Sequence, residues 1–288
     1  MHEATASSQS PLVSIITPSF NQAQFLPATI DSVRNQTYRS FEHLIVDGGS
    51  TDGTLDVLRK EGGLPNLWWV SEPDAGQADA IRKGFRMAKG RIVTWLNSDD
   101  VYLSPRVLEH VVDLFQAYPD VHMVTGGGAE IDAGGHWVRM LPPNPLRINA
   151  RHLRFCDTVL QPATFLRREV MEEISLDITL HYAFDWEFFA RVAQQYNLLV
   201  VPDVWAGYRM WGQNKTAAGD TKRVREIAEV TRRLLPGLSW QYVVLRGYSL
   251  AFGLSDRAPA RVRAWSQSAL RLSSNLLWRM TFRRIQPL

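Results

Sequence analysis

The stretch that most constrains the fold of this 288-residue chain is an apolar run at 92–96, followed at once by the polar residues 97–100, Asn-Ser-Asp-Asp. A short apolar run predicts a buried strand. Unpaired carboxylates are costly to bury, so Asp99 and Asp100 are expected at the end of that strand, facing solvent or a cation. In an open parallel sheet, ligands bind at that end. Adjacent oxygen ligands suit Mg2+ or Mn2+, and such a cation suits a diphosphate, although the same residues are also typical of a polar turn.

The first hundred residues repeat this pattern. Apolar runs predict strands over 12–17, 41–46 and 67–70, and apolar residues at helical spacing predict helices over 22–36, 54–60 and 77–89. Strands that alternate with helices are typical of a parallel α/β sheet with right-handed crossovers. Polar residues near the carboxyl ends of the strands are then expected to converge on one edge: Asp47, Asp79, Asn97 and Asp99.

Three local features add detail, and two of them have more than one interpretation. Asn21 is expected to cap the first helix. The glycine-rich loop 47–54 can lie against a flat ligand, but it can equally be a tight connection between strand and helix. Asp79 falls in the first turn of a predicted helix, where a carboxylate also stabilises the helix dipole.

Composition restricts the classes of protein to consider. The chain is 45% hydrophobic and 21% charged, which fits one large domain with an appendage, or two domains. Its one cysteine, Cys156, cannot form an internal disulfide, and this fits a reducing compartment. Residues 1–10 are polar and lack the apolar core of a signal peptide, and no apolar run is long enough for a membrane span of about 20 residues. These features predict a cytoplasmic protein.

Four motifs in order carry a resemblance to a known family. They are Val-Ser-Ile-Ile-Thr-Pro-Ser-Phe-Asn at 13–21, Asp-Gly-Gly-Ser-Thr-Asp-Gly-Thr at 47–54, Ser-Glu-Pro-Asp-x-Gly-x-x-Asp-Ala at 71–80 and Trp-Leu-Asn-Ser-Asp-Asp at 95–100. Together they resemble the family 2 glycosyltransferases, which are inverting enzymes with a GT-A fold. The resemblance covers about residues 11–216 and is strongest before Leu103. It implies a Rossmann-like, mostly parallel central sheet flanked by helices, with a C-terminal helical extension.

The resemblance implies a donor site in the first half. Asp47 would hydrogen-bond the base, uracil or thymine, and Asp99 would hold a divalent metal, Mn2+ or Mg2+. Asn97 replaces the first aspartate of the family's D-x-D motif, and an amide supplies no charge to a metal. Lys215, in a later loop, would neutralise the diphosphate, or is a solvated lysine. The donor-binding residues implied are Thr17, Pro18, Asn21, Asp47, Asp79, Asn97, Ser98 and Lys215.

The resemblance also implies an acceptor site in the second half. Asp185 matches the catalytic base of a Glu-Asp motif in which Phe184 replaces the glutamate. Asp185 would otherwise be a helix cap, and Glu187 is the reserve candidate for the base. Weaker candidates for acceptor contacts are Gly128, Gln161 and His181.

The second half predicts fewer elements. A helix is expected within 101–118, and a hairpin is expected to turn at 132–135. Strands are expected over 121–125, ending in the glycines 126–128, and over 198–201. The resemblance implies a further strand, facing the acceptor, over 160–165.

After residue 221 the chain is expected to be helical and basic. Apolar residues from Val262 to Met280 recur by threes and fours among arginines, with no carboxylate after Asp256. Such a helix either lies on anionic lipid or packs on its own catalytic domain. Basic residues cluster only in this tail, which argues against nucleic-acid binding. The predicted organisation is a polar tail at 1–10, a nucleotide-sugar-binding half at 11–103, an acceptor-side half at 104–220 and a basic helical extension at 221–288.

The sequence therefore predicts an inverting transferase. It would move a sugar from a nucleotide-diphosphate sugar to a hydroxyl of a glycan or lipid-linked glycan, in bacterial-type polysaccharide or glycolipid assembly, in the cytoplasm or at the inner face of the membrane. Asn97 and Phe184 also suit a non-catalytic protein that binds nucleotide sugars. A nucleotidyltransferase fits less well, because residues 18–24 lack a basic, glycine-rich phosphate loop.

Overall fold

The computed structural model describes residues 12–212 and 221–235, together with Val243, Gly247 and Ala251. The chain divides into two compact units, Met1–Asn214 and Lys215–Leu288. Lys215 and the predicted helix at 262–280 lie outside the described residues.

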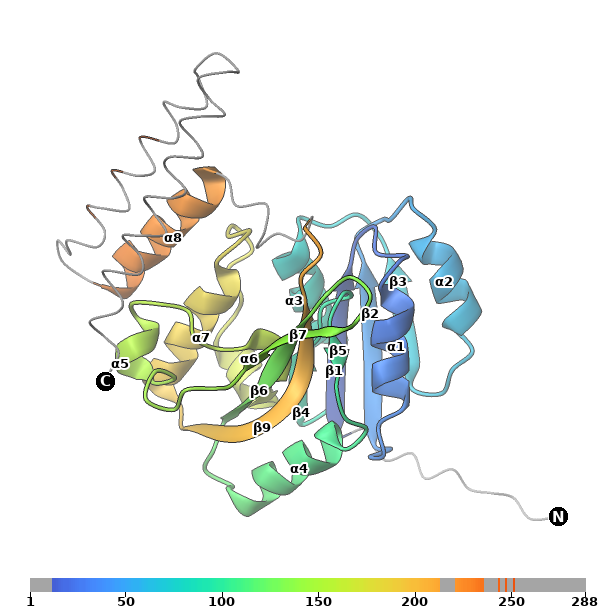
Figure 1. Ribbon diagram of the computed structural model, residues 1–288, viewed down its shortest axis with the longest axis horizontal. Coiled ribbons are helices and arrows are strands. Elements are labelled where there is room, and N and C mark those ends of the chain that lie inside the picture. The colour runs from blue at the N-terminus through green and yellow to red at the C-terminus, as the bar shows by residue number, and fades with distance from the viewer. Residues whose placement is uncertain (1–11, 213–220, 236–242, 244–246, 248–250, 252–288) are drawn as a thin grey trace. The chain divides into compact units, whose positions relative to one another are not determined.

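The first unit begins with alternating strands and helices, as Figure 1 shows in blue to cyan. These elements are β1 (Val13–Ser19), α1 (Leu26–Arg34), β2 (Phe41–Asp47), α2 (Thr54–Glu61), β3 (Leu67–Ser71), α3 (Gln77–Met87) and β4 (Ile92–Trp95). β1 pairs in parallel with both β2 and β4, and β2 pairs in parallel with β3. The predicted parallel α/β core is therefore confirmed, and the carboxyl ends of its strands share one edge.

The second half adds strands of both directions. Its elements are β5 (Val101–Tyr102), α4 (Val107–Ala117), β6 (Met123–Ile131), β7 (Trp137–Leu141), α5 (Ala150–Leu153), η1 (Gln161–Ala163), β8 (Thr164–Arg167), α6 (Arg168–Glu173), α7 (Phe184–Gln195) and β9 (Leu198–Arg209). Over the described residues the sheet has nine strands in the order β3-β2-β1-β4-β8-β6-β9-β5, with β7 paired to β6. β8 runs antiparallel to β4, so the amino end of β8 lies beside the carboxyl end of β4.

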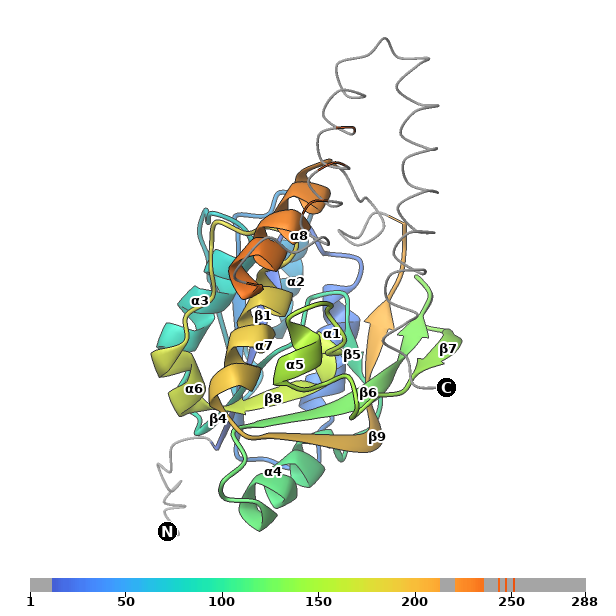
Figure 2. The same cartoon turned by 90° about the vertical axis from the view of Figure 1, so that its left-hand side faces the viewer.

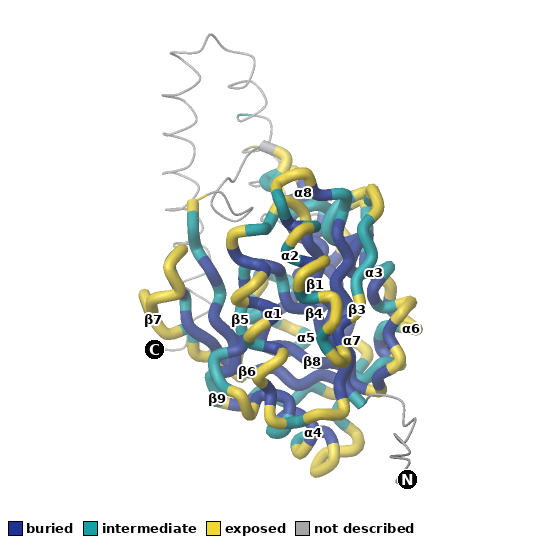
Figure 3. The backbone as a smooth tube through the Cα atoms, turned by 90° about the vertical axis from the view of Figure 1, so that its right-hand side faces the viewer, coloured by how far each residue is buried: buried dark blue, intermediate teal, exposed yellow. Residues whose placement is uncertain are grey.

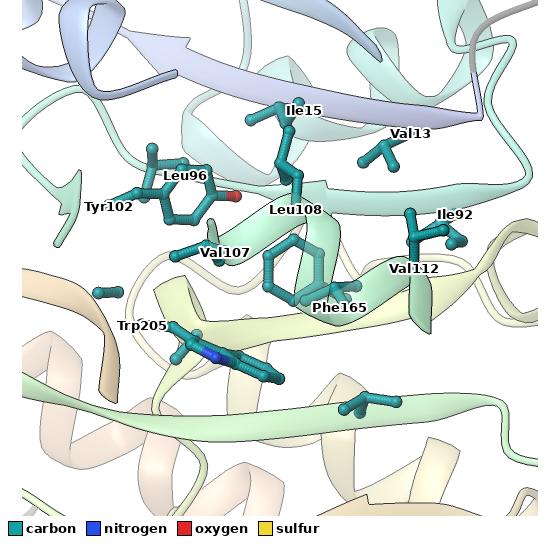
Figure 4. Close-up of a cluster of buried hydrophobic side chains, with 14 of the residues drawn as sticks. Val13, Ile15, Ile92, Leu96, Tyr102, Val107, Leu108, Val112, Phe165 and Trp205 are labelled. Carbon is teal, nitrogen blue, oxygen red and sulfur yellow. The ribbon is translucent and has the colours of Figure 1, made fainter. Parts of the chain in front are cut away.

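The helices cover both faces of the sheet because neighbouring residues of a buried strand point to opposite faces. On β1, Ile15 packs with Leu108 and Val111 of α4, as Figure 4 shows for the first two of these residues. Ile16 points the other way, toward Gly84 of α3. Figure 2 shows α3, α6 and α7 together toward the viewer. The central strands are buried, whereas β7 at the rim is largely exposed (Figure 3).

Two sequence expectations about loops are wrong. Asn21 does not cap α1, which begins at Leu26. Its backbone has a φ of 54° and its side-chain oxygen accepts a hydrogen bond of 2.9 Å from Thr51 N, so Asn21 joins the loops that follow β1 and β2. The glycines 126–128 do not follow a strand; they lie inside β6, which pairs in parallel with β9 and shifts register there.

Gly128 is needed where β6 and β9 approach each other. A Cβ atom at this position would lie 2.2 Å from Ala206 O. We expect Gly128→Ala to lower the free energy of unfolding by about 1–3 kcal/mol, because overpacking forces backbone shifts. The midpoint of thermal unfolding would fall by about 2–4 °C for each kcal/mol. Gly63→Ala is the control, since a Cβ atom there meets nothing within 4 Å. Equal midpoints for the two variants would contradict the expectation.

The second unit is described through α8 (Thr221–Leu234). Ala228, Val230 and Leu234 are buried, whereas Arg232 and Arg233 pair with Glu229. Among the described residues, no helix combines the length and the apolar character needed to cross a membrane.

Candidate active site

The loop after β2 is organised around Asp47, which is fully buried. Its Oδ2 accepts hydrogen bonds from Gly49 N at 3.1 Å, Ser50 N at 2.9 Å and Ser71 Oγ at 2.7 Å, and its Oδ1 accepts one from the Ser50 hydroxyl. Carboxylates hold backbone N–H donors well, so this side chain fixes the shape of the loop. Asp47 therefore lies at the predicted edge, with its hydrogen bonds directed into its own loop and β3.

The loop after β3 lies against the same edge. A Cβ atom on Gly48 would be 2.7 Å from Asp74 Oδ2, so the two loops touch. Asp74 Oδ1 accepts a hydrogen bond of 2.8 Å from Gly76 N, at the start of α3. Asp79 is buried in the first turn of α3, where Ala75 N and Arg82 donate to its two oxygens at 3.2 and 3.0 Å. Burial opposes ionisation, but these hydrogen bonds and the charges of Lys83 and Arg82 hold the pKa of Asp79 below its usual value.

Asn97 links three elements through its carboxamide. Its Oδ1 accepts a hydrogen bond of 2.7 Å from Gln77 Nε2 on α3. Its Nδ2 donates to Gln161 Oε1 at 3.2 Å and to Asp100 Oδ2 at 3.1 Å. Gln161 Nε2 in turn donates to Trp95 O, at the end of β4. The Asn97 amide therefore hydrogen-bonds α3, the turn after β4 and η1 together, and it holds Gln161 of the second half at the end of β4.

Asp99 and Asp100 are held by Arg209, the last residue of β9, and by Trp211, which follows that strand. Asp100 is buried and accepts a hydrogen bond of 3.0 Å from Arg209 N. Asp99 is half-buried and its Oδ2 accepts one of 3.0 Å from the indole N–H of Trp211. Burial raises the pKa of both carboxyl groups, and the neighbouring Asp99 charge raises that of Asp100 further. Ser98, the residue before them, is buried, and its backbone oxygen accepts a hydrogen bond from the hydroxyl of Thr29.

Asp185 lies in the first turn of α7, which packs directly against β4. The ring of Trp95, the last residue of β4, stacks on Phe189 with centroids 5.4 Å apart and meets Phe188 edge-on at 6.0 Å. Both phenylalanines lie about one turn after Asp185, so this packing brings the start of α7 toward the end of β4. Asp185 is half-buried and does not cap the helix, whose N-cap is Ala183. Its Oδ1 accepts a hydrogen bond of 2.8 Å from Trp186 N.

Three other candidates of the second half have definite surroundings. His181 Nδ1 lies 3.6 Å from the position that a Cβ on Gly76 would occupy, so the segment before α7 touches the start of α3. Glu187 is buried and its two oxygens accept hydrogen bonds from Arg191, both at 2.8 Å. That ion pair gives Glu187 a structural role and makes it a poor reserve base. Gly128 is buried between β6 and β9, where a Cβ atom would meet Ala206 and Leu160, and its acceptor role stays a prediction.

Sequence reasoning missed several members of this site. Gln77, Arg209 and Trp211 each contact the segment 97–100. Gln77 falls at an unspecified position of the motif at 71–80, and Arg209 and Trp211 belong to none of the four motifs. Arg209 and Trp211 are two residues apart and reach the same neighbour, the segment 97–100. Nothing in the sequence named that neighbour.

Below the edge, His43 of β2 lies fully inside the sheet, with its Nε2 2.8 Å from the hydroxyl of Thr17. Burial lowers the pKa of His43 to about 3, whereas an unfolded histidine titrates near about 6.5. Between these values the unfolded chain binds a proton that the folded chain does not. Stability from this residue is therefore complete above about pH 6.5 and is lost as the pH falls toward 3, by up to about 1.4 kcal/mol per pH unit.

We expect His43→Gln to lose stability more slowly than the wild type between pH 6.5 and 4.5, because glutamine has no proton to gain. Urea unfolding at several pH values measures this. His136→Gln is the control, because the side chain of His136 is 83% exposed. If the wild type and His43→Gln showed the same pH slope, the assignment of a neutral His43 would be wrong.

The structure thus brings Asp47, Asp79, Asn97 and Asp99 to one edge of the sheet, with the start of α7 next to it. The family model for glycosyl transferase family 2 matches residues 14–175, which include this entire edge. The chain belongs to glycosyltransferase family 2. The resemblance inferred from the sequence is confirmed.

Relatives agree with this assignment. The chain is 34% identical to an uncharacterised glycosyltransferase of Mycobacterium tuberculosis over 186 residues, which are 64% of this chain and 69% of the relative. It is 41% identical to the chondroitin synthase of Pasteurella multocida over 100 residues, which are 34% of this chain and only 10% of that protein.

Solved structures support the fold. TarS of Staphylococcus aureus (residues 1–349) in complex with UDP-GlcNAc superposes with a TM-score of 0.62 at 16% identity, covering 90% of this chain and 80% of that one. The mannosyltransferase PcManGT of Pyrobaculum calidifontis in complex with GDP-Man and Mn2+ gives 0.61 at 18% identity, covering 96% of this chain and 83% of that one. At such identities the likeness concerns the GT-A fold alone.

Proposed function

We propose that this family 2 member transfers a sugar, with inversion, from a nucleotide-diphosphate sugar to the hydroxyl of a glycan or lipid-linked glycan acceptor. The observation that carries this proposal is the juxtaposition of the edge at Asn97 and Asp99 with the first turn of α7, where Asp185 lies. The edge at Asn97 and Asp99 suits a diphosphate, and Asp185 at the start of α7 can accept a proton.

In this mechanism Asp185 is the general base. Its carboxylate takes the proton from the acceptor hydroxyl while the oxygen attacks the anomeric carbon. The bond from the anomeric carbon to the diphosphate breaks in the same displacement, so the electron pair leaves with the nucleoside diphosphate. A single displacement inverts the anomeric centre, and it needs no protein nucleophile. The transition state has oxocarbenium character, as at other glycosidic centres.

The residues at Asp99 fit a divalent cation that is shared with the substrate. Among the described residues, no group of three histidine, cysteine or carboxylate side chains comes together as a preformed metal site. Mg2+ and similar cations, however, are commonly bound by one or two carboxylates together with substrate phosphates and water. Asp99 is half-buried at the edge and suits that arrangement, whereas Asp100 is buried and bonded to Arg209 N. A cation held there would stabilise the negative charge of the departing diphosphate.

The donor side is proposed to include the predicted residues near the carboxyl ends of β1, β2 and β4 and in the first turn of α3: Thr17, Pro18, Asn21, Asp47, Asp79, Asn97 and Ser98. A uridine or thymidine diphosphate sugar is the proposed donor, and a UDP-GlcNAc complex of a protein with this fold agrees with a uridine donor. The relationship to a chondroitin synthase favours a glycan acceptor and a role in polysaccharide assembly.

A screen of nucleotide sugars tests the proposal. Thermal unfolding is measured with each nucleotide sugar, with and without Mn2+, because a ligand that binds the folded state raises the unfolding midpoint. A single donor class that raises the midpoint, and then yields transfer to glycan or lipid-linked acceptors, supports the proposal. The alternative is a non-catalytic binding protein, which Asn97 and Phe184 motivate. It would be favoured if the protein bound uridine diphosphate but neither transferred the sugar nor slowly hydrolysed the donor.

A further inference from the structure

Asp99 is held at two points by residues at the end of β9. The guanidinium Nε of Arg209 donates to Asp99 O at 2.7 Å. The indole N–H of Trp211 donates to Asp99 Oδ2 at 3.0 Å. Both side chains therefore reach the same turn, although Trp211 lies two residues beyond the end of β9. The backbone of Asp99 is therefore fixed by one residue and its carboxylate by the other.

Trp211 is itself held in place. Its ring meets the ring of Phe25 edge-on, with centroids 4.9 Å apart. Arg209 lies over the same ring, with its guanidinium carbon 5.0 Å from the centroid. Phe25 is only 4% exposed, so it is a rigid support. We call Phe25, Arg209 and Trp211 the Phe25 clamp.

The far end of Arg209 strengthens the clamp. Its Nη1 donates to Asp132 O at 3.0 Å and to Ala133 O at 3.1 Å, in the turn between β6 and β7. Its backbone N–H donates to Asp100 Oδ1 at 3.0 Å. Arg209 thus ties the segment 97–100 to the β6–β7 hairpin, and Trp211 is attached to a part of the chain that cannot easily shift.

We propose that Trp211 is a positioning residue, which orients the Asp99 carboxylate for a divalent cation. This inference rests on the proposed function, since Asp99 is the proposed ligand. A hydrogen bond to Oδ2 sets the plane of the carboxylate and thereby the direction in which Oδ1 points. Groups that orient a metal-binding carboxylate in this way commonly change metal affinity about 10–100-fold when they are removed.

The test is Trp211→Phe, which keeps an aromatic ring next to Phe25 and removes the N–H donor together with part of the indole surface. The dissociation constant of Mn2+ is measured in the presence of UDP by titration calorimetry, together with the unfolding midpoint and UDP affinity in metal-free buffer. We expect the Mn2+ dissociation constant to rise about tenfold or more, with the other two quantities nearly unchanged. Trp137→Phe makes the same chemical change at a residue that is 59% exposed, and it should leave all three unchanged.

The possible outcomes separate this inference from the proposed function. An unchanged or lower Mn2+ dissociation constant in Trp211→Phe would overturn the positioning role. A lower value would show that the indole competes with the cation. If Trp211→Phe lowers the unfolding midpoint, a second variant, Phe25→Leu, decides, because it loosens the clamp and keeps the indole. A smaller rise of the Mn2+ dissociation constant in Phe25→Leu supports the positioning role. No rise in that variant overturns it. A wild-type protein that binds neither UDP nor Mn2+ would contradict the proposed function itself, and the role of Trp211 with it.

Discussion

Asp185→Asn is expected to lower kcat by about 10²–10⁴-fold, which is the usual contribution of a general base. Asparagine has nearly the shape of aspartate but cannot take the acceptor proton. Its side-chain oxygen can still accept the hydrogen bond from Trp186 N that Asp185 accepts in the structure. Nucleotide binding should therefore remain, because Asp185 lies on α7 and not on the strand ends that form the proposed donor site. Transfer assays and calorimetric titration with the donor measure the two effects.

Glu187→Gln is the control for this prediction. It makes the same chemical change two residues later on α7, and Glu187 is bound by Arg191 at 2.8 Å. We expect a lower unfolding midpoint, since the buried end of an ion pair is lost, with kcat close to that of the wild type. The opposite result, with near wild-type kcat in Asp185→Asn and strong loss in Glu187→Gln, would move the base to Glu187.

Asp99→Asn is expected to have the second largest effect. Removing the charge that would face a cation costs several kcal/mol of transition-state stabilisation, which corresponds to a fall in kcat/KM on the order of 10²–10³-fold. Asparagine still offers an oxygen to the Trp211 indole, so the local packing should persist. The variant should also lose the increase in UDP affinity that Mn2+ gives to the wild type.

Metal-dependent binding of UDP, measured by calorimetry with and without Mn2+, checks that result. Asp113→Asn, at an exposed position of α4, controls for the loss of one negative charge. If Mn2+ strengthened UDP binding equally in the wild type and Asp99→Asn, Asp99 would not be the ligand.

The first half of the fold was predictable because its information is local. Strands β1 to β4 are short apolar runs that end in polar loops, and the intervening helices have apolar residues at helical spacing. These polar loops then lie at one edge of the sheet because the strands pair in parallel. The exact start of α1 did not follow, because Asn21 hydrogen-bonds the loop of another strand and not the helix after it.

The second half depends on pairs that are distant in the sequence. β9 was expected to end near residue 201, yet it continues to Arg209 because β6 and β5 pair with it. The glycines of β6 resemble a loop, but they permit close contact with β9. Partners such as Trp211 and Asp99 are 112 positions apart, and no local pattern reports such a contact.

Strand β8 has a neighbour on each side, and this restricts where the chain can change length. Leu166 is opposite Val93 of β4 and also opposite Met123 of β6. An insertion or deletion inside β8 would have to shift the register with both neighbouring strands and would turn buried side chains to the other face. Length changes in homologous chains should therefore accumulate in the connection between α5 and η1, where an enzyme can acquire a new acceptor loop without moving Gln161 from the end of β4.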